Sequence, residues 1–186
     1  DVRVVLEECW SEDAVRRVRA GEIDLGVIVE GADVGGLVCR PYRHDRLAAV
    51  VRDDDALAGE SVAFADLLER DLVGLESSST LTRLLEAHAA QLLRPMALRV
   101  QVKSFEAVCR AVEARLGIGV LPLAAARSFA AAMSLRVLPL ADDWALRRML
   151  LATRSEAAAG SPLAALVAHL EGCAVNEGGR AFSPTR

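Results

Sequence analysis

A glycine-terminated helix followed at once by a buried strand, in residues 19–27, constrains the fold of this chain more than any other feature. Gly21 can adopt the left-handed conformation that ends a helix without a Cβ penalty. Ile23, Leu25 and Val27, with Gly26 between the last two, are typical of a strand buried on both faces. A second junction of this kind follows in residues 112–122. Together the two junctions predict an α/β protein with two lobes and a cleft.

Composition excludes several classes of function. The 186 residues suit one large domain or two small lobes joined by a hinge, and 53% apolar residues supply a core. Aromatic residues make up only 4% of the chain, which leaves few rings on which nucleic-acid bases could stack. The chain has a net charge of −4, whereas nucleic-acid-binding domains usually carry a basic surface. Any contact with DNA must therefore lie outside these residues.

The cysteines and histidines indicate neither a metal site nor a disulfide framework. None of the four cysteines forms a CxxC pair, and the three histidines show no ligand spacing. Reduced, buried thiols in a cytoplasmic protein are the expectation, with no metal and no cofactor. No apolar run is long and charge-free enough to span a membrane, and the first residues resemble no signal peptide.

The expected elements alternate strand and helix, with consecutive strands around residues 37–51 and 135–153. Alternation predicts parallel sheets flanked by helices, and the interruptions suit a chain that leaves one lobe, builds another and returns. Residues 1–75 and 123–172 are not each assigned to a single lobe, because the chain passes between the lobes within them. We expect lobe I at about 1–51 plus 135–172, lobe II at about 52–134, and a disordered tail at 173–186.

Polar residues follow several of the predicted strands, and ligands of such sheets bind beyond the carboxyl ends of the strands. The stretch 76–80, Glu-Ser-Ser-Ser-Thr, precedes the strongly periodic helix 81–92. Ser78 or Ser79 could simply cap that helix, but only one cap is needed, so the surplus hydroxyls favour an anion site. The candidate ligand-binding residues are Val29, Glu30, Ser77, Ser78, Ser79, Thr80, Lys103, Ser104 and Phe105.

Catalysis finds little support in the sequence, and we predict no catalytic residue. Ser79 has no histidine at a useful spacing, and His88 falls on the apolar face of the same helix. Gly117-Ile118-Gly119 lacks the glycine spacing of a dinucleotide motif. We expect Asp53-Asp54-Asp55 to form a solvated acidic turn and Arg147-Arg148 to form a solvated strand edge.

Eight short matches, in order, resemble the effector-binding domain of LysR-type transcriptional regulators. Arg19–Val27 resembles G-E-x-D-x-G/A, Ser79–Glu86 resembles S-x-L-R-R-L-L-D, and Val112–Pro122 resembles V-A-A-G-x-G-I-x-x-L-P. The resemblance covers about residues 2 to 172. The other matching segments are Val4–Glu8, Gly36–Pro41, Asp54–Ala58, Ala65–Leu67 and Val102–Val108.

The resemblance implies a periplasmic-binding-protein-like (type II) fold with two Rossmann-like lobes and a hinge. In the family, the DNA-binding winged helix-turn-helix and the first strand and helix of the effector domain all precede the position of Asp1, so they are missing from this chain. The implied function is cytoplasmic sensing of a small-molecule effector, without enzymatic activity. Effector bound in the cleft between the lobes would alter the geometry of a homodimer or tetramer, paired partly through Glu12–Ala20. DNA would be contacted only through the missing domain.

The ligand itself stays open at this point. Hydroxyls at helix N-termini suit a carboxylate, whereas Glu30 and Glu76, if they pointed inward, would favour a cationic or amide-bearing ligand. The alternatives are a solute-binding protein of a transport system and an enzyme on the same fold, such as an acid dehydratase or a tetrapyrrole-forming deaminase. Arg115 also departs from the family, which commonly has glycine there; a left-handed non-glycine residue costs roughly 1 kcal/mol.

Overall fold

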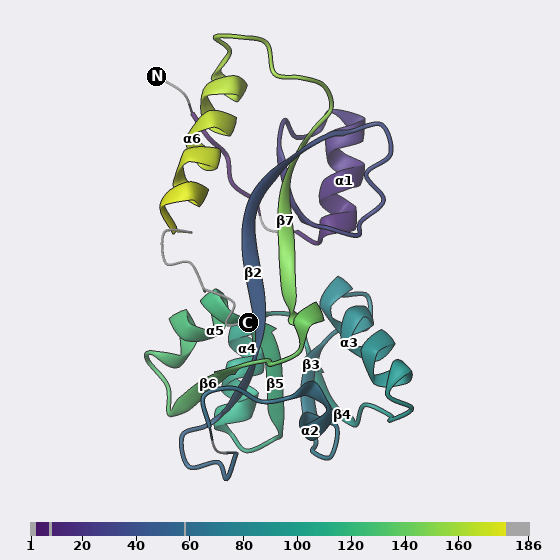
Figure 1. The fold of residues 1–186 in the computed structure, drawn as a ribbon, viewed down its shortest axis with the longest axis vertical. Coiled ribbons are helices and arrows are strands. Elements are labelled where there is room, and N and C mark those ends of the chain that lie inside the picture. The colour runs from purple at the N-terminus through teal and green to yellow at the C-terminus, as the bar shows by residue number, and fades with distance from the viewer. Residues whose placement is uncertain (1–2, 8, 58, 178–186) are drawn as a thin grey trace, which may run out of the picture. The chain divides into compact units, whose positions relative to one another are not determined.

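The computed structural model describes residues 3–7, 9–57 and 59–177, and these form two compact units. The first unit comprises the described residues up to 44 and from 148 onward; the second comprises residues 45–147. The elements (Figure 1) are α1 (Ser11–Ala20), β1 (Gly26–Val29), β2 (Val38–Arg52), α2 (Phe64–Leu67), β3 (Leu72–Leu75), α3 (Thr80–Gln91), β4 (Leu98–Val102), α4 (Phe105–Glu113), β5 (Ile118–Pro122), α5 (Leu123–Ala130), β6 (Leu135–Pro139), the 3-10 helix η1 (Asp143–Ala145), β7 (Leu146–Thr153) and α6 (Pro162–Glu177).

In the first unit, α1 packs on β1, which pairs antiparallel with β7. Ala14, Val15 and Val18 form the buried face of α1. Gly21 ends the helix with φ +72, and the Arg154 guanidinium lies where a Cβ would stand. The predicted glycine stop is therefore confirmed, and it is the left-handed backbone that favours glycine here.

The start of α1 has no side-chain cap, although a serine stands at its first position. Trp10 is the N-cap residue, and Ser11 is the first residue of the helix. The Ser11 hydroxyl instead accepts a hydrogen bond of 3.2 Å from the Val29 backbone N–H. Ser11 thus ties the helix to the end of β1 rather than satisfying the helix's own N–H groups.

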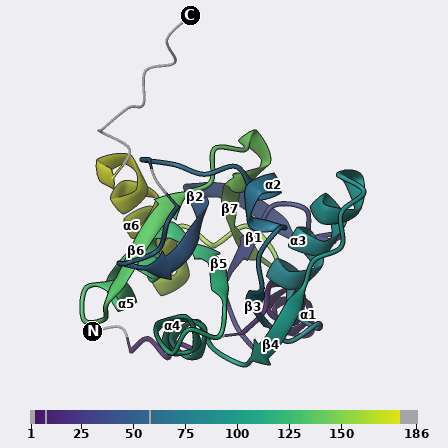
Figure 2. The ribbon, with the colours of Figure 1, turned by 90° about the horizontal axis from the view of Figure 1, so that it is seen from below.

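The second unit is built on a sheet with strand order β6-β2-β5-β3-β4. β3 runs parallel to β4 and β5, whereas β2 runs antiparallel to β5 and β6. Figure 2 shows α4 and α5 on one face of this sheet and α3 on the other. At Gly119 an added Cβ would stand 2.6 Å from a methyl group of Val108, so α4 packs directly on the β5 backbone.

The amino ends of β3 and β5 meet at Gly117, the glycine of the second junction. Its φ is +150, and a Cβ there would lie 2.6 Å from the Asp71 carbonyl oxygen. The neighbouring Ile118 N–H donates a hydrogen bond of 2.9 Å to the same oxygen. Only glycine permits this close approach of two backbones.

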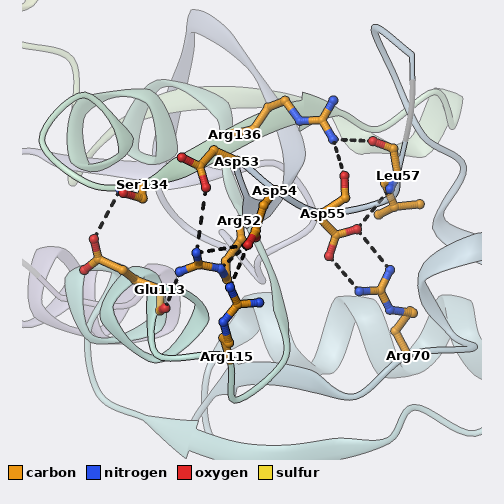
Figure 3. Close-up of polar contacts among 10 residues, drawn as sticks. All are labelled: Arg52, Asp53, Asp54, Asp55, Leu57, Arg70, Glu113, Arg115, Ser134 and Arg136. Atoms are coloured by element: carbon orange, nitrogen blue, oxygen red, sulfur yellow. Dashed lines mark hydrogen bonds and ion pairs between the residues drawn. The ribbon is translucent and has the colours of Figure 1, made fainter.

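Arginine–carboxylate contacts fill the region around the end of β2 (Figure 3), where the sequence predicted a solvated acidic turn. Arg52 and Arg115 both bind Asp54, at 2.8 and 2.6 Å. Arg70 binds Asp55 at 2.7 Å, and that carboxylate is buried to 12% exposure. Asp54 is exposed in a turn, as predicted, although two arginines bind it. The prediction is wrong for Asp55, because Arg70, from a later part of the chain, covers its carboxylate.

Other expectations also need correction. The two predicted strands at 37–42 and 46–51 are one continuous strand, β2, because Arg43 and His44 are exposed without breaking the extended backbone. The units divide at 44/45 and 147/148 rather than near 51/52 and 134/135, since β2 pairs with β5 and β6. Of the predicted disordered tail, residues 173–177 continue α6, and residues 178–186 lie outside the described residues.

None of the described helices has the length and apolar character needed to cross a bilayer.

Candidate functional site

Two loops leave the carboxyl edge of the sheet side by side in the second unit. β3 and β4 are parallel neighbours, and Leu75 is in register with Val102 at their ends. The Glu76 N–H donates a hydrogen bond of 3.1 Å to the Val102 carbonyl, which holds the two exits together. The segments 76–80 and 103–105 therefore lie at one edge, as expected for parallel strands.

The loop after β3 is fixed by its own hydrogen bonds. Ser79 is fully buried, and its hydroxyl accepts a hydrogen bond of 3.2 Å from Leu81 N–H, so it is the N-cap of α3. The Ser79 N–H donates to the Glu76 carbonyl at 2.9 Å. Ser79 thus has the structural role of a cap, whereas Ser77 and Ser78 beside it are exposed.

The loop after β4 repeats this arrangement. The Ser104 hydroxyl accepts a hydrogen bond of 3.2 Å from Ala107 N–H and caps α4. Phe105, the first residue of α4, is half-buried. The N-termini of α3 and α4 thus both begin at this edge, where their positive dipole ends favour an anion.

The charges at this edge neutralise each other. Lys103 Nζ lies 3.6 Å from Glu76 Oε1, with side-chain exposures of 84% and 47%. An ion pair this exposed contributes little to stability, so an incoming ligand can displace it at small cost. The orientation of Glu76, which the sequence left open, is settled: its carboxylate faces Lys103.

Val29 and Glu30 belong to the first unit. Val29 ends β1, and the Glu30 N–H donates a hydrogen bond of 2.8 Å to the Arg148 carbonyl. The Glu30 carboxylate pairs with the Arg148 guanidinium at 3.2 Å. Neither glutamate is therefore an unpaired negative charge.

Two polar residues near this edge were not among the predicted site residues. The buried Thr82 hydroxyl donates a hydrogen bond of 3.0 Å to the Leu75 carbonyl, and the Gln101 amide donates to the same oxygen at 3.4 Å. Thr82 lies one turn into α3, on the face that packs against the sheet. A threonine inside an apolar helical face was the available signal, because a buried hydroxyl requires a partner.

The remaining chemically interesting side chains have structural partners. His88 is half-buried and stacks on Trp144, with ring centroids 3.8 Å apart. Cys109 is buried in α4, where desolvation raises the pKa of its thiol to about 11. Arg147 is not at a solvated edge as predicted but forms a buried ion pair with Asp45. Within the described part of the chain, no group of histidine, cysteine and acidic side chains could hold a metal ion.

Comparison with known proteins places this architecture. The family model described as the LysR substrate binding domain matches residues 1–174. This chain belongs to that family. A search of curated proteins found no match to its sequence.

Solved structures share the fold of this LysR-type domain at low sequence identity. The CcmR regulatory domain of Synechocystis PCC6803 in complex with 2-PG has a TM-score of 0.78 and 21% identity, over 90% of this chain and 81% of that one. The BenM effector binding domain with its effector benzoate has a TM-score of 0.79 and 18% identity, over 98% and 82%.

Full-length BenM matches with a TM-score of 0.78 and 19% identity, over 98% of this chain but 61% of that protein. The LysR-type domain thus spans under two thirds of the length of full-length BenM. At these identities the likeness shows the fold alone.

Proposed function

We propose that this LysR-type domain senses a small anionic effector and that effector binding regulates transcription through a DNA-binding domain elsewhere in the protein. The observation that carries this proposal is the family match over residues 1–174. It favours a regulator over the alternatives of a transport protein or an enzyme. Binding would act by shifting the populations of two conformations of the regulator, which requires a difference in affinity between them.

We infer that the carboxyl edge of β3 and β4 takes part in effector binding, with Ser77, Ser78, Lys103 and the N-terminal turns of α3 and α4 as the anion-binding groups. Three observations support this. Two helix N-termini begin at one edge, Glu76 is paired with Lys103, and Glu30 is paired with Arg148. Benzoate and shikimate, carboxylates named for the BenM and QuiR domains, give the class of probe to use first.

A pair of opposite substitutions tests this site. Lys103→Gln removes the cation and should weaken binding of a carboxylate about three- to tenfold, whereas Glu76→Gln removes the competing anion and should strengthen it. Isothermal titration calorimetry with benzoate, shikimate and 2-PG measures both. At one hundred times Kd, a bound carboxylate should stabilise the domain by about 2.7 kcal/mol, which thermal unfolding reports independently.

The serine caps need a matched control because their loss also weakens a helix. Ser79→Ala and Ser104→Ala should each cost about 1 kcal/mol of stability. Ser161, whose hydroxyl accepts from Ala164 N–H at the start of α6, supplies a cap outside the proposed site. Ser161→Ala should destabilise without changing ligand affinity. Equal effects of Lys103→Gln and Glu76→Gln, or none, would exclude this edge as the binding site.

A further inference from the structure

The turn after α3 displays an apolar side chain in a strained conformation. Leu93 is 92% exposed with φ +55, and Leu92 before it is 45% exposed. Glycine is the residue that ordinarily adopts this left-handed conformation at a helix end, because a Cβ is unfavourable there. A leucine at this position is unfavourable for folding in two ways, through backbone strain and through exposure of its side chain.

A hollow of about 420 Å³ lies beside this leucine, at the carboxyl end of α3. Small or flexible apolar side chains line it: Ala89, Ala90, Pro95 and Met96. Its volume falls within the range of ligand pockets, but it is open to solvent. Leu93 is itself one of the lining residues, yet it is 92% exposed, so only a surface larger than a small ligand would cover the hollow and the leucine together.

One acidic and one basic residue also line the hollow. Glu86 has no ion pair within the described residues. Arg94 is half-exposed; its guanidinium donates a hydrogen bond of 3.1 Å to the Ala65 carbonyl and lies 3.4 Å from Glu69, whose side chain is 72% exposed. A surface with one acid, one base and an apolar centre is its own charge complement under a two-fold rotation, as an isologous interface requires.

We propose that the surface formed by Glu86, Ala90, Leu93, Arg94 and Met96, the α3-end surface, binds the same surface of a second copy of this chain. Leu93 of each copy enters the hollow of the other, and Glu86 of each faces Arg94 of the other. The occupant is a second copy because one symmetric contact covers the exposed leucine, fills the hollow and places each acid opposite a base. An exposed, energetically costly apolar side chain beside a cavity is the usual character of an interface anchor.

Charge reversal tests this contact by sedimentation over a range of concentrations. Glu86→Arg and Arg94→Glu each place like charges opposite one another and should weaken self-association about tenfold or more. The double variant Glu86→Arg/Arg94→Glu should associate like the wild type. A mixture of the two single variants should form a heterodimer, because one then presents two bases and the other two acids. Failure of the mixture or of the double variant to recover association overturns the proposal.

Leu93→Gly separates an interface role from a structural role. Glycine relieves the strain, so the monomer should become more stable to denaturant while self-association weakens; a loss of both would mean that Leu93 serves the fold alone. Arg99→Glu, a charge reversal on β4 outside the hollow, is the matched control and should leave association unchanged. Wild-type protein that stays monomeric at every concentration, or charge variants that associate as the wild type does, overturns the contact, without bearing on effector binding.

Discussion

Arg115 combines an unfavourable backbone with a favourable side-chain contact. Its φ is +65, and its guanidinium lies 2.6 Å from Asp54. Arg115→Gly and Arg115→Ala both lose the ion pair, but only glycine relieves the backbone. We therefore expect Arg115→Gly to be more stable than Arg115→Ala by about 1 kcal/mol, measured by urea denaturation.

Arg99 provides the opposite case. It too pairs with an aspartate, Asp71 at 3.1 Å, but it lies within strand β4. Glycine is unfavourable inside a strand, so Arg99→Gly should be less stable than Arg99→Ala. The same order at both positions would show that backbone strain at Arg115 is not what separates the variants.

Residue-scale features were predictable where their cause is local in sequence. The caps at Ser79 and Ser104 and the left-handed Arg115 follow from neighbours within a few positions. The arginine partners of Asp55 were not predictable, since Arg70 and Arg136 lie far along the chain from it. Whether the nine predicted ligand-binding residues bind a ligand stays a prediction.

At the scale of elements, β2 and β7 are joined by a buried ion pair between Asp45 and Arg147. The side chains are 12% and 11% exposed, and Arg147 Nε is buried without a hydrogen-bond partner. Removing one partner leaves a buried charge, so Asp45→Leu or Arg147→Met should each cost about 3 kcal/mol or more. Asp45→Leu/Arg147→Met should recover most of that loss, because no charge remains to be desolvated.

Chemical denaturation of the single and double variants measures the coupling. The next residue supplies a control: Arg148 forms an exposed pair with Glu30. Arg148→Met should change stability by less than about 1 kcal/mol. Additive losses at Asp45 and Arg147 would contradict the expected coupling.

Patterns of alternation predicted where the helices and strands lie better than they predicted which elements pack against each other. The helix expected at 81–92 is α3 (Thr80–Gln91), and strands and helices alternate from β3 to α5 as the sequence predicted. Alternation assigns a side chain to one face of a strand but does not say what covers that face. For this reason Arg147 was expected at a solvated edge, although Asp45 covers it.

At the scale of the whole molecule, the order of strands and helices predicted the α/β class, and eight short sequence matches in order predicted the LysR-type family. The division into units was less accurate because it depends on which strands pair. Ala48 pairs with Leu121 and with Pro139, which draws most of β2 and all of β6 into the second unit. No pattern within residues 45–51 alone encodes those partners.

Acid should destabilise the protein through the arginine–carboxylate contacts around the end of β2 (Figure 3). The hydrogen bond from Arg52, followed by that from Arg115, lowers the pKa of Asp54 to about 2. The hydrogen bond from Arg70 lowers the pKa of Asp55 below its ordinary value of 3.8. Because both values fall on folding, their stabilisation is complete above about pH 4 and is lost as the pH falls towards 2.

Asp54→Asn/Asp55→Asn removes both charges. This variant should be less stable than the wild type at about pH 6, and the difference should shrink steadily between about pH 4 and 2, where the wild-type carboxylates take up protons. Urea denaturation at each pH measures the free energy of unfolding. Asp53 lies 3.9 Å from Arg52, too far for a hydrogen bond, so Asp53→Asn should follow the wild-type profile. A difference that stays constant down to pH 2 would mean that the two aspartates stabilise the second unit by packing rather than by charge.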